Sequence, residues 1–322
     1  ETRASFVRGL ERVNTQASIL AEGQLYHGDS GQYLKDFGTL MAATPASVKA
    51  VADKWIARGD YTLTVVPGKV EGADMATVAG RAAASGAPAP VLTPKGDYKT
   101  VSSDVDRSKG VPEVGSFPDL SFPTLQHGKL DNGVEVVLAE RHAVPAVQMQ
   151  LLFDAGYAAD QGRKLGTSSF TMSMLDEGTR DLDSVEIAKR KQRLGAIIAS
   201  GCGLDYCNAS LNALDDQLKP SLDLFADIVR NPAFRDADVS RLRGQWLAGI
   251  AQEKSQPIGI ALRTLPPLLY GKGHAYAIPF TGTGTEASIK SLTDADMRQF
   301  ITDYIRPDNM KILVAGDTTM AK

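Results

Sequence analysis

Residues 166–179 read GTSSFTMSMLDEGT, a short apolar run with a glycine at each end. Its apolar side chains recur closely enough to predict a helix over Thr167–Leu175. Ser169 and Ser173 are four residues apart, so both lie on one face of this helix. The run therefore predicts a packed helix that carries a pair of small polar side chains.

Strand and helix patterns alternate on both sides of this helix. The predicted strands are Val134–Glu140, Val147–Asp154, Leu204–Leu211 and Lys311–Ala315. The predicted helices are Ser184–Leu194, Leu218–Val229, Asp236–Gln256 and Asp294–Tyr304. Strands interleaved with long helices predict an α+β fold, with helices packed on mixed or antiparallel sheets.

The chain before this block has two different parts. Residues 1–68 predict helices, around 10–20 and over Ser47–Ala57, and then a strand over Tyr61–Val66. Residues 69–123 are rich in proline, glycine and alanine and predict a linker. The segment Thr44–Gly68 also parallels Thr293–Gly316, since each has a capped helix before an apolar strand that stops at glycine. We therefore expect tandem copies of one helix-on-sheet unit.

Composition and charge exclude several classes of protein. The 322 residues are 43% hydrophobic and 23% charged, which excludes a disordered or collagen-like chain. Acidic and basic residues nearly balance, 38 against 35, so nucleic-acid binding is not expected. No apolar run is long enough to predict a membrane span. Because the chain opens at Glu1 directly in a helical pattern, we expect it to be a piece of something longer.

The run Gly166–Thr179 resembles the inverted zinc motif of the pitrilysin/insulinase (M16) family of zinc peptidases, which has the form G-x-x-H-x-x-E-H-x-x-x-x-G-T. There, two histidines one helical turn apart bind zinc, and the glutamate polarises the bound water. Here Ser169 and Ser173 stand at the histidine positions and Met172 at the glutamate position. The family's third ligand, a glutamate on a later helix, falls at Ala248. The resemblance thus implies a metal-free, non-catalytic unit without a cofactor of its own.

Further matches extend the resemblance over about four-fifths of the chain. They stand in the family's order and are Leu194-Gly195-Ala196, Asn231-Pro232, Leu269–Tyr276 and Ile305–Met310. Residues 1–68 are similar to the end of the closing subdomain of a first unit, and residues 124–322 to the first subdomain of a second, degenerate unit. The resemblance implies the duplicated fold of the mitochondrial processing peptidases and insulinases. An arginine–tyrosine pair, if present, would lie beyond Lys322.

The resemblance also implies partners. In this family two homologous units close over a chamber, within one polypeptide or as separate subunits, and often only one holds zinc. We therefore expect a homologous zinc-bearing unit as partner, zinc only in that partner, and a peptide substrate that this unit helps to bind. The alternative is a purely structural subunit, comparable to the core proteins of respiratory complexes, without a proteolytic role.

Other candidate side chains give weaker signals. His27, His127, His142 and His274 are far apart and are predicted to be surface or turn residues. No Gly-x-Ser-x-Gly elbow surrounds Ser169 or Ser173, so neither is expected to be a nucleophile. The run 282–285 follows Pro279-Phe280 and is predicted to be a turn, not a phosphate loop. Charges on Asp236–Gln256 are expected to be solvated; lining of a substrate chamber is the alternative.

Cys202 and Cys207 flank a four-residue stretch, 203–206. If this stretch forms a hairpin, the two sulfurs could meet and oxidise; two separate thiols are the other interpretation. A disulfide would favour a periplasmic or secreted protein, although a cytoplasmic location stays open. A cysteine-based redox module is a third functional hypothesis.

Overall fold

The computed structural model describes residues 1–57 and 121–321, together with positions 59, 61, 63–64, 106, 108, 110, 115–116 and 119. These residues form two compact units, Glu1–Met41 with Phe122–Lys322, and Ala42–Ser121. The predicted strand over Tyr61–Val66 and most of the predicted linker 69–123 lie outside the described residues.

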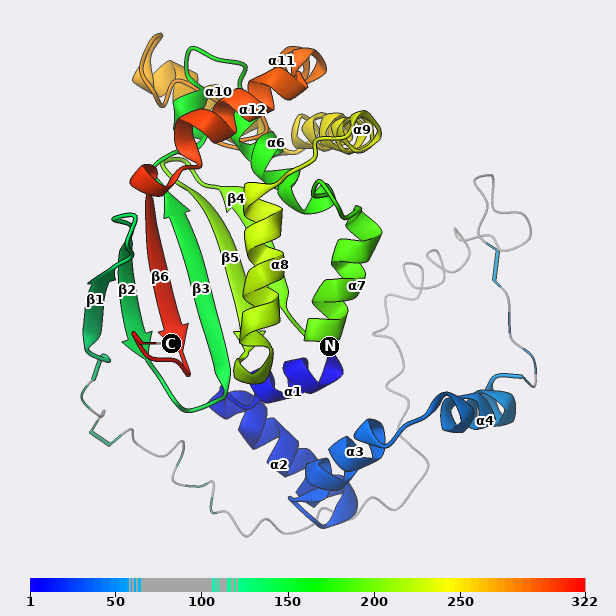
Figure 1. The fold of residues 1–322 in the computed structure, drawn as a ribbon. Coiled ribbons are helices and arrows are strands. Elements are labelled where there is room, and N and C mark those ends of the chain that lie inside the picture. Colours follow the sequence, from blue (N-terminus) through cyan, green and yellow to red (C-terminus); the bar gives the residue numbers. More distant parts are fainter. Residues whose placement is uncertain are drawn as a thin grey trace. The chain divides into compact units, whose positions relative to one another are not determined.

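A six-stranded mixed sheet forms the centre of the first unit (Figure 1). Its strands are β1 (Leu125–Lys129), β2 (Glu135–Glu140), β3 (Ala146–Phe153), β4 (Ile197–Cys202), β5 (Cys207–Leu214) and β6 (Met310–Gly316). The spatial order is β1-β2-β6-β3-β5-β4, with β2 and β6 parallel and every other neighbouring pair antiparallel. The predicted α+β class with a mixed sheet is therefore confirmed.

Helices cover one face and one end of this sheet (Figure 1). On the face lie α7 (Ser184–Leu194) and α8 (Leu218–Arg230), with α8 packed on β5. At the end lie α6 (Thr167–Ser173), α9 (Asp236–Glu253), α10 (Pro257–Tyr270), α11 (Glu286–Ser291) and α12 (Asp294–Tyr304). The bounds of α7 and α12 are those predicted from the sequence.

Two apolar cores share the helix α6. Met172, fully buried, joins the core between the sheet and α8, which includes Leu211 and Phe225. Phe170 and Met174 join a second core against α9 and α12. Because successive helix residues point about 100° apart, Met172 faces away from Phe170 and Met174. A helix of seven residues thus has apolar partners on both sides.

Three further helices belong to the first unit: α1 (Thr2–Gly9), α2 (Val13–His27) and α3 (Gln32–Met41). Arg8 of α1 donates to the side-chain oxygen of Asn212 on β5 and, at 2.6 Å, to the carbonyl oxygen of Gly195. Ala4 is buried at the same place, where an added Cβ on Gly195 would lie 2.6 Å from its methyl group. These contacts attach α1 to the sheet unit.

The second unit contains α4 (Pro45–Trp55). Thr44 caps α4 through a reciprocal pair of hydrogen bonds with Ser47, and Thr293 caps α12 in the same way with Asp296. The helical half of the predicted duplication therefore has matching caps. The strand half of its first copy lies outside the described residues.

Four of the elements differ from the sequence predictions as follows. Residues 203–206 form a hairpin turn, so β5 begins at Cys207 instead of Leu204. The predicted helix Asp236–Gln256 ends at Glu253, and Pro257 then occupies the first turn of α10. Sequence reasoning missed α10 because Pro266 and Pro267, which usually end helices, lie inside it. β1 was also missed, since its five residues show little apolar alternation.

We expect Phe170→Ala to destabilise the protein strongly, because the ring is completely buried and lies 5.4 Å, edge to face, from Trp246. Loss of a buried phenylalanine costs about 3 to 5 kcal/mol. Urea unfolding followed by circular dichroism measures the change. Phe122→Ala is the matched control, because Phe122 is 78% exposed and its loss should change the free energy of unfolding little. Equal small effects of both substitutions would contradict the assignment of α6 to the core.

Candidate functional site

The motif helix α6 has the conformation that the sequence predicts and lacks the ligand side chains. Ser169, Met172 and Ser173 all lie on α6, and the two serines are half-buried. Met172 is buried in the core, and its carbonyl oxygen accepts a hydrogen bond of 2.7 Å from Ser200 of β4. A thioether in this apolar contact cannot take up a proton from water. In the family's motif this position bears the general base, whereas here an apolar side chain packs there.

A glycine-rich loop packs directly on the first turn of α6. An added Cβ on Gly284 would lie 2.0 Å from the carbonyl oxygen of Leu165, so only glycine fits there. Next to it, an added Cβ on Gly282 would lie 2.8 Å from the Tyr157 ring and 3.2 Å from the Ser169 hydroxyl. The predicted turn at 282–285 is a loop that lies against one of the former histidine positions, not a phosphate site.

Arg263 and Glu253 hold this loop in place. Arg263 of α10 lies 2.6 Å from the Glu253 carboxylate of α9, and its side chain is only 9% exposed. Arg263 also donates to the Thr283 hydroxyl at 2.9 Å and to the Gly284 carbonyl oxygen at 2.5 Å. The Glu253 carboxylate also accepts a hydrogen bond from the Thr283 hydroxyl. Both of its contacts therefore stabilise the loop.

The start of α6 is fixed by a buried carboxylate. Asp160 is 1% exposed and accepts hydrogen bonds from the backbone N–H of Gly166 at 2.8 Å and of Ser168 at 3.1 Å. The Ser168 hydroxyl donates to it at 3.0 Å. Burial raises the pKa of Asp160 to about 6, although these hydrogen bonds act in the opposite direction. Sequence reasoning missed Asp160, since nothing in its local pattern distinguishes it from a surface aspartate.

The fourth motif position, Ala248, is exposed on α9. Two residues earlier on α9, Trp246 donates from its indole nitrogen to the carbonyl oxygen of Thr283 at 3.0 Å and contacts Phe170 of α6. Helices α6 and α9 are therefore neighbours, as a shared metal site would require. Neither contributes a ligand side chain at a motif position.

The four histidines are surface or turn residues, as predicted. His27 ends α2, and His127 lies on β1 at 3.8 Å from Glu135. His142 lies 2.6 Å from the Asp317 carboxylate, and this hydrogen bond raises the pKa of His142 above its usual value. His274 stacks on Tyr270. Within the described residues, no three histidine, cysteine, aspartate or glutamate side chains are grouped closely enough to hold a metal ion.

Cys202 and Cys207 form a disulfide. They are directly opposed on β4 and β5, at the end of the hairpin. The turn inside the bridge accepts hydrogen bonds from the backbone N–H groups of Tyr157 and Ala158, just before Asp160. The bridged hairpin thus supports the segment that caps α6, which is a structural role.

Most charges on α9 are paired within the unit. Arg241 contacts Glu177, Arg243 donates to the carbonyl oxygen of Leu292 at 2.7 Å, and Lys254 lies 2.5 Å from Glu286. These contacts favour a structural surface over the lining of a substrate chamber. Among the described residues, no helix is both long and apolar enough to cross a bilayer.

A mixed sheet with a helix that keeps the spacing of an inverted zinc motif but not its ligands defines a metallopeptidase-like unit that has lost its metal-binding residues. The family model for insulinase, peptidase family M16, matches residues 135–274. The match confirms the resemblance that the sequence analysis identified.

Each of three relatives matches more than half of the chain. The crystal structure of an M16 peptidase inactive domain from Pseudomonas fluorescens is 32% identical, with a TM-score of 0.59, over 62% of this chain and 48% of that one. The uncharacterized zinc protease YmxG of Bacillus subtilis is 26% identical over 58% of this chain and 45% of its own length. The non-peptidase homolog YmxG of Helicobacter pylori is 21% identical over 63% of this chain and 47% of its own length.

Further relatives, at 22% identity, are the beta subunit of the mitochondrial-processing peptidase of Rattus norvegicus and the alpha subunit of that of Solanum tuberosum. The chain spans less than half of the length of all these relatives. The family, the missing ligand side chains and the inactive and non-peptidase relatives support a non-catalytic M16-like unit.

We expect the buried Asp160 to make stability fall as pH rises. Its pKa is raised from 3.8 to about 6, so the folded protein keeps a proton that the unfolded chain has released between these values. The contribution is therefore full below about pH 4 and is lost as pH rises through 6, with about 1 kcal/mol lost between pH 5 and pH 7. Urea unfolding at both pH values measures it.

Asp160→Asn should remove this part of the pH dependence and lower stability at both pH values, since an amide offers one acceptor oxygen in place of two. Asp154→Asn, at an exposed position, is the control and should keep the wild-type profile. An unchanged profile in Asp160→Asn would show that another group causes the dependence.

Proposed function

We propose that this chain is the non-catalytic unit of a two-unit zinc peptidase, in which it completes the chamber and helps to bind a peptide for a homologous zinc-bearing unit. The observation that carries the proposal is an intact motif helix without ligands at Ser169, Met172, Ser173 and Ala248. A chain that had simply lost its function would be free to lose the fold of this helix as well. Instead, a buried cap and two apolar cores stabilise it.

An exposed apolar surface on α10 supports a partner unit. Most apolar side chains of this helix face outward; those at least 42% exposed are Ile258, Ile260, Leu262, Leu265, Leu268, Leu269 and Tyr270. Exposed apolar side chains gathered on one helix are typical of protein–protein contacts. The partner that fits it best is the homologous zinc-bearing unit, since relatives of this chain are subunits of a two-subunit enzyme and the chain spans less than half of its relatives. That unit is part of the same polypeptide or a separate subunit.

The disulfide supports an oxidising location for the protein. Bridges such as Cys202–Cys207 persist in the periplasm and outside the cell, and the cytosol keeps thiols reduced. We therefore propose a periplasmic or secreted protein. The bridge lies at the end of a hairpin, which favours a structural role over a redox function.

The experiment for this proposal combines the chain with a homologous unit that has an intact His-x-x-Glu-His motif and measures peptide cleavage. The chain should raise kcat/KM of the zinc-bearing unit about tenfold or more, because a closed chamber holds the peptide in place. The Leu268→Glu/Leu269→Glu variant should fold normally and lose this effect, since two charges would face the apolar contact.

The matched control is Val185→Glu, which adds a charge at an exposed apolar position of α7 and should leave the activation unchanged. If the two units associate and the rate of cleavage does not change, the purely structural role is the correct one. If the α10 variant activates as well as the unaltered chain, the partner binds elsewhere.

We also expect the chain to hold no zinc. After equilibration with a small excess of zinc and removal of free metal, elemental analysis should find far less than one zinc per chain, because serine hydroxyls and a thioether are poor zinc ligands at neutral pH. One tightly held zinc per chain would overturn the non-catalytic interpretation. It would mean that histidines such as His127, His142 and His274 bind metal together with partners outside the described residues.

A further inference from the structure

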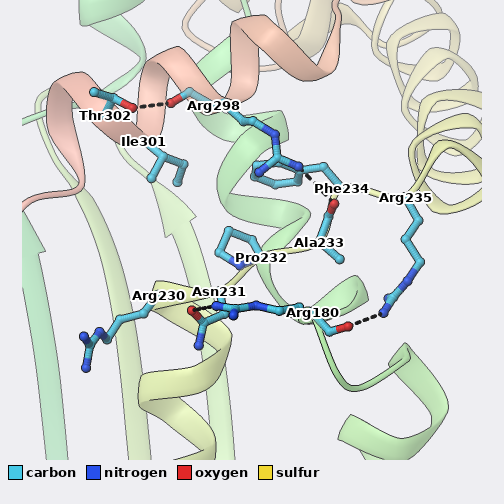
Figure 2. Close-up of a pocket in the computed structure, with 10 residues that line it drawn as sticks. All are labelled: Arg180, Arg230, Asn231, Pro232, Ala233, Phe234, Arg235, Arg298, Ile301 and Thr302. Atoms are coloured by element: carbon cyan, nitrogen blue, oxygen red, sulfur yellow. Dashed lines mark hydrogen bonds between the residues drawn. The ribbon is translucent and has the colours of Figure 1, made fainter.

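A pocket of about 580 Å³ opens beside the end of α8 (Figure 2). Its lining comes from the segment Arg230–Arg235, from Arg180 and from three residues of α12, Arg298, Ile301 and Thr302. Four of these ten residues are arginines and none of the ten is acidic. None of the four motif positions lines it, so the pocket is a separate feature of the unit.

The backbone around the pocket is held by many hydrogen bonds. The N–H of Arg180 donates to the carbonyl oxygen of Asn231 at 3.0 Å, and the N–H of Ala233 donates to that of Gly178 at 2.9 Å. The Arg235 side chain donates to the carbonyl oxygens of Thr179, at 2.7 Å, and of Leu182. These hydrogen bonds preorganise the pocket, and the Arg235 side chain is used in making them.

Phe234 adds an unusual backbone conformation to the pocket wall. Its φ angle is 49°, and no other non-glycine residue in the described part of the chain has a positive φ. Such a conformation costs free energy and is retained where the surroundings impose it. The ring is buried, and the Arg298 guanidinium lies 5.3 Å from its centre. The strain fixes the place of the Ala233 carbonyl oxygen, to which Arg298 donates at 3.2 Å.

The positive charges of the pocket are poorly balanced. Arg298 is paired with Asp294 at 2.8 Å. Arg180 has a single side-chain partner, the Asn231 amide oxygen at 3.0 Å. The Arg230 side chain is exposed, and its guanidinium makes no hydrogen bond or ion pair with any described residue. Two guanidinium groups are thus largely free to bind an external anion.

The arrangement of these groups indicates the shape of the anion. In Figure 2 the guanidinium groups of Arg180, Arg230 and Arg298 are spread along the pocket and do not converge on one point. Spread cations suit carboxylates distributed along a chain better than one compact phosphate group. Pro232 and Ile301 supply apolar surface between them. A guanidinium group pairs with a carboxylate through two parallel hydrogen bonds.

We propose that this pocket binds an acidic peptide segment in which glutamate or aspartate side chains alternate with apolar ones. Arg180 and Arg230 bind the carboxylates, and Pro232 and Ile301 contact the apolar side chains. The inference stands on the pocket alone and requires neither a zinc-bearing partner nor a chamber. It therefore holds or fails separately from the proposed function.

The test uses the full chain and a short fluorescein-labelled peptide of alternating glutamate and leucine, with fluorescence anisotropy as the measurement. Arg180→Ala/Arg230→Ala should weaken binding about tenfold or more, since two charge-assisted pairs are lost. The matched control, Arg190→Ala/Arg193→Ala, removes the same charge from α7 and should leave binding nearly unchanged. On the unaltered chain, the same peptide with glutamine in place of glutamate should bind about tenfold more weakly or worse.

Three results would overturn the proposal. The first is an equal loss of affinity in the pocket variant and in the α7 variant, which would indicate general electrostatic attraction. The second is equal binding of the glutamate and glutamine peptides by the unaltered chain, a result that does not depend on how any variant folds. The third is binding of inorganic phosphate that the pocket variant abolishes, together with no binding of the acidic peptide.

Discussion

The packing of α6 between two cores is the constraint on which the rest of the unit depends. Met172 faces the sheet, and Phe170 and Met174 face α9 and α12, so one short helix separates and joins both cores. Protein interiors are close-packed, so a change in the size of a buried α6 side chain lowers the stability of the core that it faces. The first turn of α6 is also held by the hydrogen bonds to Asp160 and by the glycine loop at 282–284.

This packing explains how a unit can lose a catalytic motif and keep the motif's helix. Residues between the ligand positions, such as Phe170, pack in the core. The ligand positions themselves are half-buried or exposed. Serine at the two histidine positions removes the metal ligands, and methionine at the glutamate position removes the base while its side chain packs in the core. The loop that lies against Ser169 then occupies space next to the former site.

The sequence predicted the helices with strong periodicity, and α7 and α12 have the predicted bounds. The sequence analysis missed α10, because it contains Pro266 and Pro267. Proline usually ends a helix, but here both prolines lie inside one. At the motif helix, spacing alone placed Ser169, Met172 and Ser173 correctly, since one regular helix fixes all three. Asp160 and the arginine pocket could not be predicted, because their partners are brought together by tertiary contacts between segments that have no common pattern.

The position of β6 has a consequence for how the chain folds. This strand, the last in the sequence, pairs with β2 on one side and β3 on the other, and β2 and β3 do not pair with each other. Until residues 310–316 have been made, the strands β1 and β2 are separated from the sheet formed by β3, β5 and β4. Contacts between residues so distant in sequence form slowly. During synthesis, the edges of β2 and β3 therefore stay unpaired until β6 is available to join them.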